Sequence, residues 1–249
     1  MSLKLSVTII TLNEEENIGA CLDSIKDITD EIILVDSGST DKTIDIAKKY
    51  GAKIYFRKLE NFANQKNWAL SKATGDWIFS IDADEIITTD LKKEIEEKIQ
   101  DNSYDGYLIP RRNFILGKEI KHSRWSPDKH VWLWRRDRGE WEGEVHEEVR
   151  VNGRIGEIKN AKIHFQSKSV EDFINNLNSY SSLYAKKIFK EGRRFSFFSL
   201  LFDPIYEFNI RYIYKFGFFD GWRGFVLAYL MAFYQLSVWI KLYELQKTK

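Results

Sequence analysis

Two aspartates separated by one residue form the clearest candidate metal site in this sequence. Asp82 and Asp84 follow an apolar run in the string FSIDADE. Side chains alternate along a strand, so both carboxylates point the same way if the extended geometry persists. Such a pair can hold Mg²⁺ or Mn²⁺ and leave open positions for phosphate oxygens. A solvated turn that caps the next helix is the other interpretation. We favour the metal site because Asp36 ends a neighbouring predicted strand.

Polar residues also follow two earlier predicted strands. The string DSGSTD, residues 36–41, combines a glycine that permits a tight turn with side chains that can cap a helix. The string TLNE, residues 11–14, is by itself an ordinary helix start, but beside the other strand ends it offers a polar contact surface. Neither a GxGxxG nor a Walker A pattern is present, so phosphate must be held by a metal and by scattered donors.

These polar segments belong to a regular alternation of strands and helices. Short runs rich in Ile and Val predict buried strands at Leu5–Thr11, Glu31–Asp36, Ala52–Phe56 and Trp77–Asp82. Helical spacing predicts helices at about 14–27, 41–50, 62–74 and 89–100. The alternation predicts an α/β fold, a mostly parallel Rossmann-like sheet with helices on both faces. The carboxyl ends of the strands then meet at one edge, where open sheets bind ligands.

Composition narrows the function classes. The 249 residues carry a net charge of +1, which argues against a nucleic-acid-binding protein. A single cysteine, Cys21, excludes an internal disulfide framework and suits a reducing compartment. The apolar run Leu5–Ile10 is too short for a signal peptide and is soon followed by the string NEEE, so we expect this part of the chain to stay in the cytoplasm.

Four strings in register resemble family 2 glycosyltransferases with the GT-A fold. They are VTIITLNE (7–14), IILVDSGSTDKT (32–43), QKNWAL (65–70) and TGDWIFSIDADE (74–85). The resemblance is strong over residues 4–90, looser to 165 and weak beyond. It implies an enzyme that moves a sugar from a nucleotide-sugar, expected to be UDP-linked, by a single displacement that inverts the anomeric centre.

The resemblance also implies roles for the residues at the strand ends. It places the nucleotide-sugar against Thr11, Asn13, Glu14, Asp36, Lys66 and Asp82. Asp36 would hydrogen-bond the uracil edge, and Lys66 would lie near the nucleotide. Asp82 and Asp84 would contact the ribose and a divalent metal, Mn²⁺ or Mg²⁺, bound to the diphosphate.

An inverting transfer needs a base that takes the proton of the acceptor hydroxyl as the new bond forms. The string GEVHE, residues 143–147, resembles a signature of a branch that includes lipopolysaccharide-core glucosyltransferases. We therefore expect Glu147 to be the catalytic base, with His146 beside the diphosphate or the metal. Glu144 and Glu148 are adjacent alternatives, and an exposed acidic hairpin without a catalytic role is another.

Three further residues complete the predicted site. His164 alternates with apolar neighbours, which is typical of a structural histidine, but some GT-A enzymes use a late histidine as a metal ligand. Trp141 lies beside the proposed base and is expected to stack on an acceptor sugar, the alternative being a core position. Arg112 is expected to contact an anionic acceptor, the alternative being a solvated face.

The last third of the chain has a different composition. We expect a GT-A catalytic domain over 1–168, with a nucleotide-sugar half (1–115) and an acceptor half (116–168), and then a helical region over 169–249. Asp203, Glu207, Arg211 and Lys215 recur every four residues with the acids first, an order that favours helix pairs.

The helical region also has the composition of a membrane-surface element. It is rich in aromatic residues, has no charge between Gly224 and Ile240, and has basic residues clustered between Lys186 and Arg194. A helical tail with a basic collar predicts an anchor that lies on the membrane surface. A homodimer interface or a helical cover on the core is the alternative.

These features together predict a metal-dependent inverting glycosyltransferase, peripheral at the inner face of the cell membrane. The expected acceptor is a lipid-linked or cell-envelope glycan, such as a lipopolysaccharide core. One alternative is a haloacid-dehalogenase-like phosphatase, but its Asp-x-Asp motif usually ends the first strand, and here the motif ends the fourth predicted strand. The other is a non-catalytic, membrane-bound glycan-binding scaffold.

Overall fold

The structure is a computed structural model of the chain and describes residues 3–143 and 147–247. These residues form two compact units. The first contains the chain up to Arg111 together with Lys129–His164, and the second contains Arg112–Asp128 together with the chain from Phe165 onward. Every described residue predicted for the site, except Arg112, belongs to the first unit. The domain boundary expected after residue 168 stays a prediction.

The first unit is built on four parallel strands. They are β1 (Leu5–Thr11), β2 (Glu31–Asp36), β3 (Lys53–Phe56) and β4 (Trp77–Ser80). Their order in the sheet is β3-β2-β1-β4, and Thr11 pairs with Asp36 where β1 and β2 end. The central strands are almost continuously buried, which is why they read as apolar runs. Their carboxyl ends share the edge that carries the polar segments.

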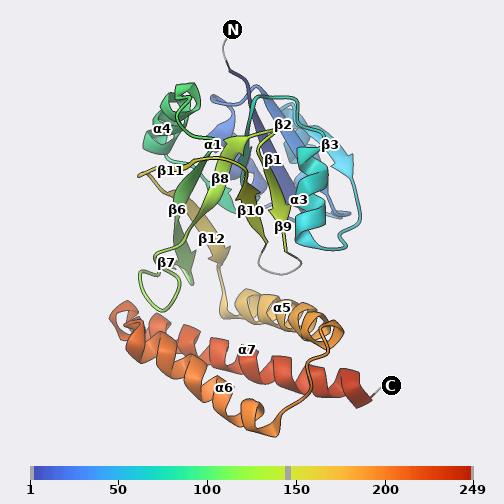
Figure 1. Ribbon diagram of the computed structural model, residues 1–249, viewed down its shortest axis with the longest axis vertical. Helices are drawn as coiled ribbons and strands as arrows, with labels where there is room; N and C mark the ends of the chain where they lie inside the picture. The colour runs from blue at the N-terminus through green and yellow to red at the C-terminus, as the bar shows by residue number, and fades with distance from the viewer. Residues whose placement is uncertain (1–2, 144–146, 248–249) are drawn as a thin grey trace. The chain divides into compact units, whose positions relative to one another are not determined.

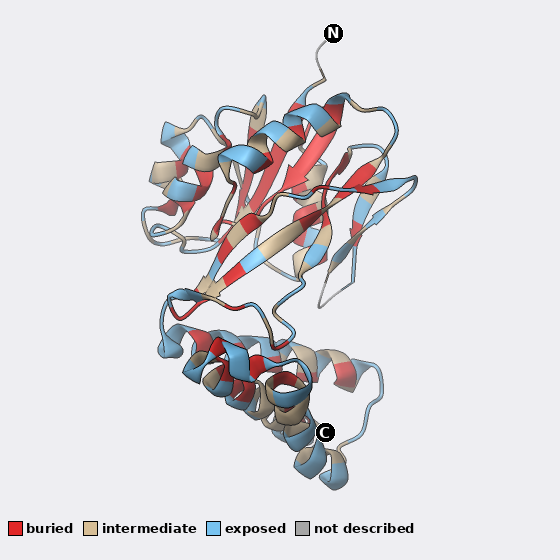
Figure 2. Cartoon of the chain, turned by 90° about the vertical axis from the view of Figure 1, so that its left-hand side faces the viewer, coloured by how far each residue is buried: buried red, intermediate tan, exposed pale blue. Residues whose placement is uncertain are grey.

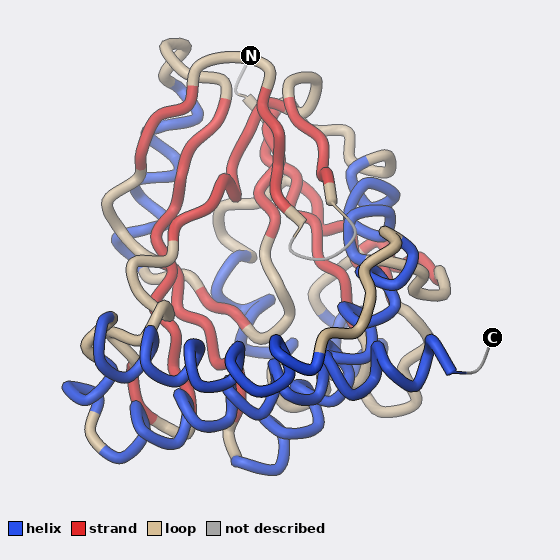
Figure 3. The backbone as a smooth tube through the Cα atoms, turned by 60° about the horizontal axis from the view of Figure 1, so that its bottom comes forward, coloured by secondary structure: helices blue, strands red, loops and turns tan. Residues whose placement is uncertain are grey.

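Helices connect these strands and flank the sheet on both sides (Figure 1, Figure 3). They are α1 (Ile18–Ile25), α2 (Thr43–Lys49), α3 (Phe62–Leu70) and α4 (Thr89–Gln100). The side chains of Asn61 and Thr88 accept hydrogen bonds from the first turns of α3 and α4. Such caps satisfy amide groups that have no partner inside the helix. The predicted α/β fold with helices on both faces is confirmed.

The sheet continues beyond β4 with mixed strands. They are β5 (Glu85–Ile86), β6 (Gly106–Ile115), β7 (Lys118–Glu119), β8 (Lys129–Arg135), β11 (Ile155–Glu157) and β12 (Lys162–Ser167). The order after β4 is β8-β6-β12-β5, and β8 is antiparallel to β4. A separate hairpin is formed by β9 (Gly139–Glu142) and β10 (Glu148–Val151). These strands supply the second half of the candidate site.

The fourth strand is shorter than the sequence predicts. We expected it to run through Asp82, but β4 ends at Ser80, and the amide of Glu85 donates a hydrogen bond to the carbonyl of Asp82. The chain therefore turns at Asp82–Glu85 instead of staying extended. The alternation argument for Asp82 and Asp84 was wrong for this reason, because a turn does not hold two side chains on one face of a strand.

The second unit is mainly helical. It contains α5 (Val170–Lys190), α6 (Phe197–Asn209), the π-helical turn η1 (Ile210–Tyr214), the 3-10 turn η2 (Gly217–Asp220) and α7 (Trp222–Lys247). Ser169 begins α5 with a capping box formed with Asp172. Helix α7 packs along both α5 and α6, and many positions on these helices are exposed (Figure 2). Among the described residues, α7 is long and apolar enough to cross a membrane by length and composition.

Candidate active site

The loops that follow β1 and β2 are hydrogen-bonded to each other. The amide of Asn13 donates to the Ser39 hydroxyl, and the Asn13 side chain accepts from the amide of Thr40, each at 2.8 Å. Asn13 is left-handed, with φ of 56°, a conformation that asparagine adopts more readily than most residues. The segments predicted to cradle a nucleoside are therefore fixed as one loop pair.

Asp36 is the buried centre of this loop pair. One of its carboxylate oxygens accepts from the amides of Gly38 and Ser39 at 2.8 Å, and the other accepts from the Ser39 hydroxyl. Gly38 has φ of 110°, which a residue with a side chain would adopt only with strain. The Asp36 carboxylate thus shapes the turn, which explains why an acid ends this strand.

The two remaining residues of this region lie beside the loop pair. The amide of Glu14 donates to the Thr43 hydroxyl at 2.7 Å, and the Glu14 carboxylate accepts from Asn17. Thr11 is buried, and its hydroxyl has no hydrogen-bond partner among the residues that the structure describes. Contacts of these groups with a nucleoside stay predictions.

The turn at Asp82–Glu85 is held from beneath by a buried ion pair. The Glu85 carboxylate accepts from the amide of Asp82 at 2.9 Å and lies 2.6 Å from the ammonium of Lys162. Both side chains of this pair are fully buried, and the Lys162 ammonium lies 3.2 Å from the ring centroid of Trp132. Burial lowers the pKa of Lys162, although Glu85 opposes this effect. The ion pair therefore fixes the backbone that carries Asp82.

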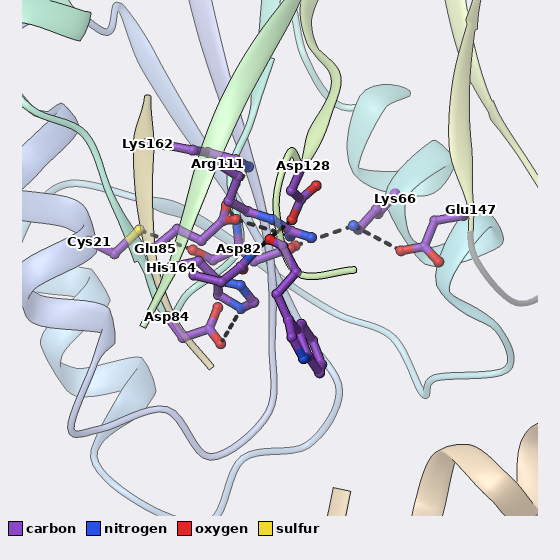
Figure 4. Close-up of polar contacts among 12 residues, drawn as sticks. Cys21, Lys66, Asp82, Asp84, Glu85, Arg111, Asp128, Glu147, Lys162 and His164 are labelled. Atoms are coloured by element: carbon purple, nitrogen blue, oxygen red, sulfur yellow. Dashed lines mark hydrogen bonds and ion pairs between the residues drawn. The ribbon is translucent and has the colours of Figure 1, made fainter. Parts of the chain in front are cut away.

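Lys66 joins the two halves of the site. Its ammonium lies 3.2 Å from the Asp82 carboxylate and 3.0 Å from that of Glu147 (Figure 4). It also lies 4.4 Å from the ring centroid of Trp141. Burial alone would lower the pKa of Lys66, but Asp82 and Glu147 outweigh it and raise this pKa above its ordinary value. Burial would raise the pKa of Asp82, but Lys66 and further cations hold it well below its usual range.

Three consecutive residues of α3 each hold a different part of the site. Gln65 donates to the Ser37 hydroxyl in the loop after β2, at 3.2 Å. Lys66 pairs with the turn after β4 and with Glu147. Asn67 exchanges two hydrogen bonds with the backbone of Trp141 in β9, at 2.8 and 2.9 Å. Helix α3 therefore sets the positions of the loop after β2, the aspartate turn and the hairpin relative to one another.

Asp84 points away from this cluster and meets His164. The Asp84 carboxylate lies 3.1 Å from His164 Nε2, and His164 is opposite Glu85 where β12 pairs with β5 (Figure 4). Burial would lower the pKa of His164, but Asp84 outweighs it and raises this pKa. Two neighbouring ligands of an octahedral Mg²⁺ or Mn²⁺ lie about 3 Å apart, because each is about 2.1 Å from the ion. The 3.1 Å spacing matches that of two adjacent ligands, but it is equally that of the hydrogen bond between the two groups, so the metal role of Asp84 and His164 stays a prediction.

The structure does not bring all predicted residues together. Asp82 and Asp84 face different partners, Lys66 and His164 respectively. Within 3–143 and 147–247, no three His, Cys, Asp or Glu side chains gather into a group that could hold a metal. Arg112 belongs to the second unit, where its guanidinium makes two hydrogen bonds of 2.9 Å to Glu119. The predictions for His146 and Glu144 fall outside the described residues. The roles predicted for all these residues stay predictions.

Trp141 was singled out from the sequence, whereas two other residues of the site were not. Trp141 is buried with Lys66 over its ring, and its sugar-stacking role stays a prediction. Sequence reasoning missed Lys162 and Asn67. Lys162 lies two residues before His164 on one strand, so the alternation of side chains could have placed both on the same buried face. Asn67 carries no comparable signal, because its partners are backbone atoms in another element.

Two solved structures share the fold of this chain. TarS 1–349 of S. aureus, determined in complex with UDP-GlcNAc, matches with a TM-score of 0.52 at 16% identity, covering 96% of this chain and 89% of that one. The mannosyltransferase PcManGT of Pyrobaculum calidifontis, determined with GDP-Man and Mn²⁺, matches with a TM-score of 0.52 at 15% identity, covering 78% and 65%. At these identities the likeness shows the fold alone, which is the GT-A fold expected from the sequence.

Sequence relatives carry the comparison further. An uncharacterized glycosyltransferase of Rickettsia typhi is 33% identical over 255 residues, covering 97% of this chain and 87% of the relative. The lipopolysaccharide core biosynthesis glycosyltransferase LpsC of Rhizobium meliloti is 30% identical over 252 residues, covering 97% and 93%. Residues 6–153 match the family described as glycosyl transferase family 2. These matches confirm the resemblance and set aside the phosphatase alternative: the chain is a glycosyltransferase that belongs to glycosyl transferase family 2.

Proposed function

We propose that this glycosyltransferase moves a sugar, with inversion, from a UDP-linked donor to a lipid-linked or cell-envelope glycan, such as a lipopolysaccharide core. The observation that carries the proposal is the position of Asp82, which pairs with Lys66 and thereby connects to Glu147, while its neighbour Asp84 meets His164. A candidate metal pair and a candidate base thus flank one turn. The name of LpsC supports the acceptor class, and the UDP-GlcNAc complex of TarS supports the donor class.

The donor would lie at the carboxyl ends of β1, β2 and β4. In the proposal, the loop pair around Asn13 and Asp36 takes the nucleoside, and Asp82 contacts the ribose. The GDP-Man and Mn²⁺ complex of PcManGT supports the use of a metal. Asp84 and His164 would hold the ion, which supplies positive charge against the diphosphate as it leaves. Their side chains are partly accessible, at 23% and 11%, so they can reach a ligand.

The acceptor would be activated by Glu147. Its carboxylate accepts the proton of the acceptor hydroxyl while the hydroxyl oxygen bonds to the anomeric carbon and the bond from that carbon to the diphosphate breaks. Lys66 orients this carboxylate through their 3.0 Å ion pair. Trp141, fixed by Asn67, borders the acceptor sugar in this arrangement. The enzyme would work at the inner face of the cell membrane; a homodimer formed through the helical tail is the alternative use of that region.

The test is donor binding and turnover by the full chain. A panel of nucleotide-sugars is added with and without Mn²⁺, and thermal stability and release of the nucleotide are measured. We expect UDP-sugars with Mn²⁺ to give the largest rise in melting temperature and metal-dependent release of UDP. Asp84→Asn should abolish metal-dependent release and keep the fold, while Asp137→Asn, at an exposed acid of the same unit, should behave as the parent.

Two outcomes would count against the proposal. Full turnover by Asp84→Asn would contradict the metal assignment. Binding of sugars without release of nucleotide under any condition would support the non-catalytic scaffold instead.

A further inference from the structure

The helices of the second unit carry an unusual distribution of side chains. Large apolar side chains point outward from α6, η1, η2 and the start of α7, and the following ones, which we call the aromatic face, are each more than half exposed: Phe197, Phe198, Tyr206, Tyr214, Phe219 and Trp222. A soluble protein rarely exposes so many large apolar groups on neighbouring elements. The face therefore requires a partner.

Charged side chains show the opposite arrangement. The acids between Gly192 and Tyr243 all have partners inside the unit. Asp203 accepts from the indole of Trp239, Glu207 pairs with Arg211 in the interior, and Asp220 accepts from the amides of Lys121 and His122. A water-facing helical unit would place these groups outside and its aromatic residues inside. Here apolar groups face out and acids face in.

The exposed charges beside the aromatic face are mainly positive. In the same stretch the exposed charged residues are Arg193, Arg194 and Lys215. Lys186 and Lys190, at the end of α5, are also exposed, and Glu191 is the one exposed acid among these cations. A second copy of the chain would bring like charges together, which is unfavourable. An anionic lipid surface instead offers apolar depth for the rings and negative headgroups for the cations.

The aromatic face is held rigidly from within. A Cβ at Gly224 would lie 1.8 Å from the carbonyl oxygen of Gly217, so glycine is needed for η2 to close on the first turn of α7. Asp220 fixes the same turn through its two amide partners. Phe219 and Trp222 project from this fixed turn, so a lipid surface would meet side chains whose backbone is already ordered.

One side of helix α7 is covered by the other helices of the unit and is not accessible to lipid. Its buried residues, such as Leu230 and Trp239, pack within the helical unit, and the Lys241 ammonium makes hydrogen bonds to Asn178, Ser181 and Ser182 of α5. The polar surface of α5 is unsuited to a hydrocarbon core. The arrangement fits helices that lie in the plane of the interface.

We infer that the aromatic face is a docking surface for an anionic phospholipid bilayer, with α6 and the start of α7 lying in the headgroup region. This inference rests on the proposed function, which places the enzyme at a membrane, and it names the surface of the chain that would bind there. Because vesicle binding is measured without donor or metal, its failure is distinguishable from a failure of the proposed function, which is measured as donor binding and nucleotide release without lipid.

The test is sedimentation of the full chain with vesicles. Neutral phosphatidylcholine vesicles are compared with vesicles that also contain phosphatidylglycerol. We expect binding to the anionic vesicles and its weakening by salt. Phe219→Ser should lower the partition coefficient about fivefold, because the variant loses the free energy gained when one aromatic ring moves from water into the bilayer. Phe56→Ser is the matched control, since Phe56 in the first unit has the same exposed fraction, 67%, and should not change binding.

A second pair of variants tests the cations. The double variant Arg193→Glu, Arg194→Glu should weaken binding to anionic vesicles by about tenfold or more. Lys48→Glu, Lys49→Glu reverses two adjacent exposed lysines on α2 and should have little effect. Circular dichroism and melting temperature confirm that each variant is folded.

Three results would overturn the inference. The parent chain fails to sediment with anionic vesicles at low salt, or Phe219→Ser binds them as the parent does. In the third, light scattering without lipid shows a dimer that Phe219→Ser dissociates, which would assign the face to a second copy of the chain.

Discussion

The ammonium of Lys66 lies 3.0 Å from the carboxylate of Glu147, and the same ammonium lies 3.2 Å from Asp82. Glu147 precedes β10, whereas Asp82 follows β4, so a single side chain of α3 connects the hairpin to the turn after β4. Its charge offsets two carboxylates that would otherwise repel each other. Any change in the position of Lys66 therefore affects both sides.

Removal of the Lys66 charge should lower turnover through Glu147. We expect Lys66→Met to reduce kcat on the order of 10²-fold, within the range that positioned acid–base groups contribute. A double-mutant cycle with Glu147→Gln isolates the coupling, because Lys66→Met should cost less once Glu147 is already neutral, and the loss that remains acts through Asp82. Steady-state kinetics with saturating donor, together with the Kd for UDP, provide the measurement.

A neighbouring lysine is the matched control for that cycle. Lys72 follows α3 and lies over the ring of Trp68 at 4.7 Å, but it has no role in the site as described. Lys72→Met should keep kcat within about twofold, as expected of a substitution outside the site. Additive losses in the Lys66 and Glu147 cycle would show that the two residues act independently.

The buried pair of Glu85 and Lys162 should affect stability more when broken than when removed. Lys162→Met leaves the Glu85 carboxylate buried with the Asp82 amide at 2.9 Å and the Arg111 guanidinium at 3.4 Å, and should cost about 3 kcal/mol or more of unfolding free energy. The double variant Glu85→Gln, Lys162→Met should recover much of this loss. Urea unfolding followed by tryptophan fluorescence measures both. Equal losses of unfolding free energy in the single and double variants would mean that the two side chains stabilise the protein by packing and not by their charges.

His164 should determine how much metal the enzyme needs. We expect His164→Ala to raise the Mn²⁺ concentration for half-maximal UDP release by about tenfold or more, since one of two proposed ligands is lost. His130→Ala, at a more exposed histidine of the first unit, should leave the metal requirement unchanged. Titration of Mn²⁺ at fixed donor concentration tests this. An unchanged requirement in His164→Ala would remove His164 from the metal site.

Glu31 should make stability depend on pH in the acid range. Burial raises the pKa of Glu31, but hydrogen bonds from Lys53, Ser6 and Thr74 outweigh it and lower the pKa to about 2. A carboxylate with a lowered folded pKa stabilises fully above its ordinary value of 4.5. This contribution, about 3 kcal/mol, is then lost as the pH falls from 4.5 toward 2.

The measurement is the melting temperature against pH for the parent and Glu31→Gln. The two curves should lie apart at neutral pH and converge as the pH falls. Glu97→Gln, at an exposed acid of α4, should follow the parent throughout. Curves that stay parallel down to pH about 2 would show that Glu31 is not the group that titrates.

The sequence predicted the parallel half of the fold closely, for a physical reason. Strands such as β1 and β2 are buried on both faces, so they appear as uninterrupted apolar runs with polar residues where they end. The end of β4 was misplaced because the chain turns where the Glu85 carboxylate accepts from the Asp82 amide, and this buried carboxylate is paired with Lys162 from a distant strand. A contact between residues so far apart in the sequence cannot be predicted from the hydrophobic periodicity of either segment.

The helical second unit shows the same limit of prediction from the sequence. The four-residue spacing predicted that Glu207 and Arg211 would pair, and they do. It did not predict that the pair would be buried, because burial depends on contact with another segment of the chain. There the carbonyl of Ser123 accepts a hydrogen bond from Arg211 at 2.8 Å. In the site, the metal-ligand prediction for Asp84 and His164 came from residue type and resemblance and stays a prediction, whereas the pairing of Lys66 with both Asp82 and Glu147 is seen only in the structure.

The contact between Asn67 and β9 has a consequence for how such an enzyme diversifies. Asn67 bonds only to main-chain atoms of Trp141, so it is indifferent to the side chains that the hairpin carries. Exposed residues of the hairpin, such as Glu142 and Arg150, can therefore be replaced while this contact is kept. Under the proposed function, such changes would alter which acceptor sugar is preferred and leave the positions of Lys66 and Glu147 unchanged.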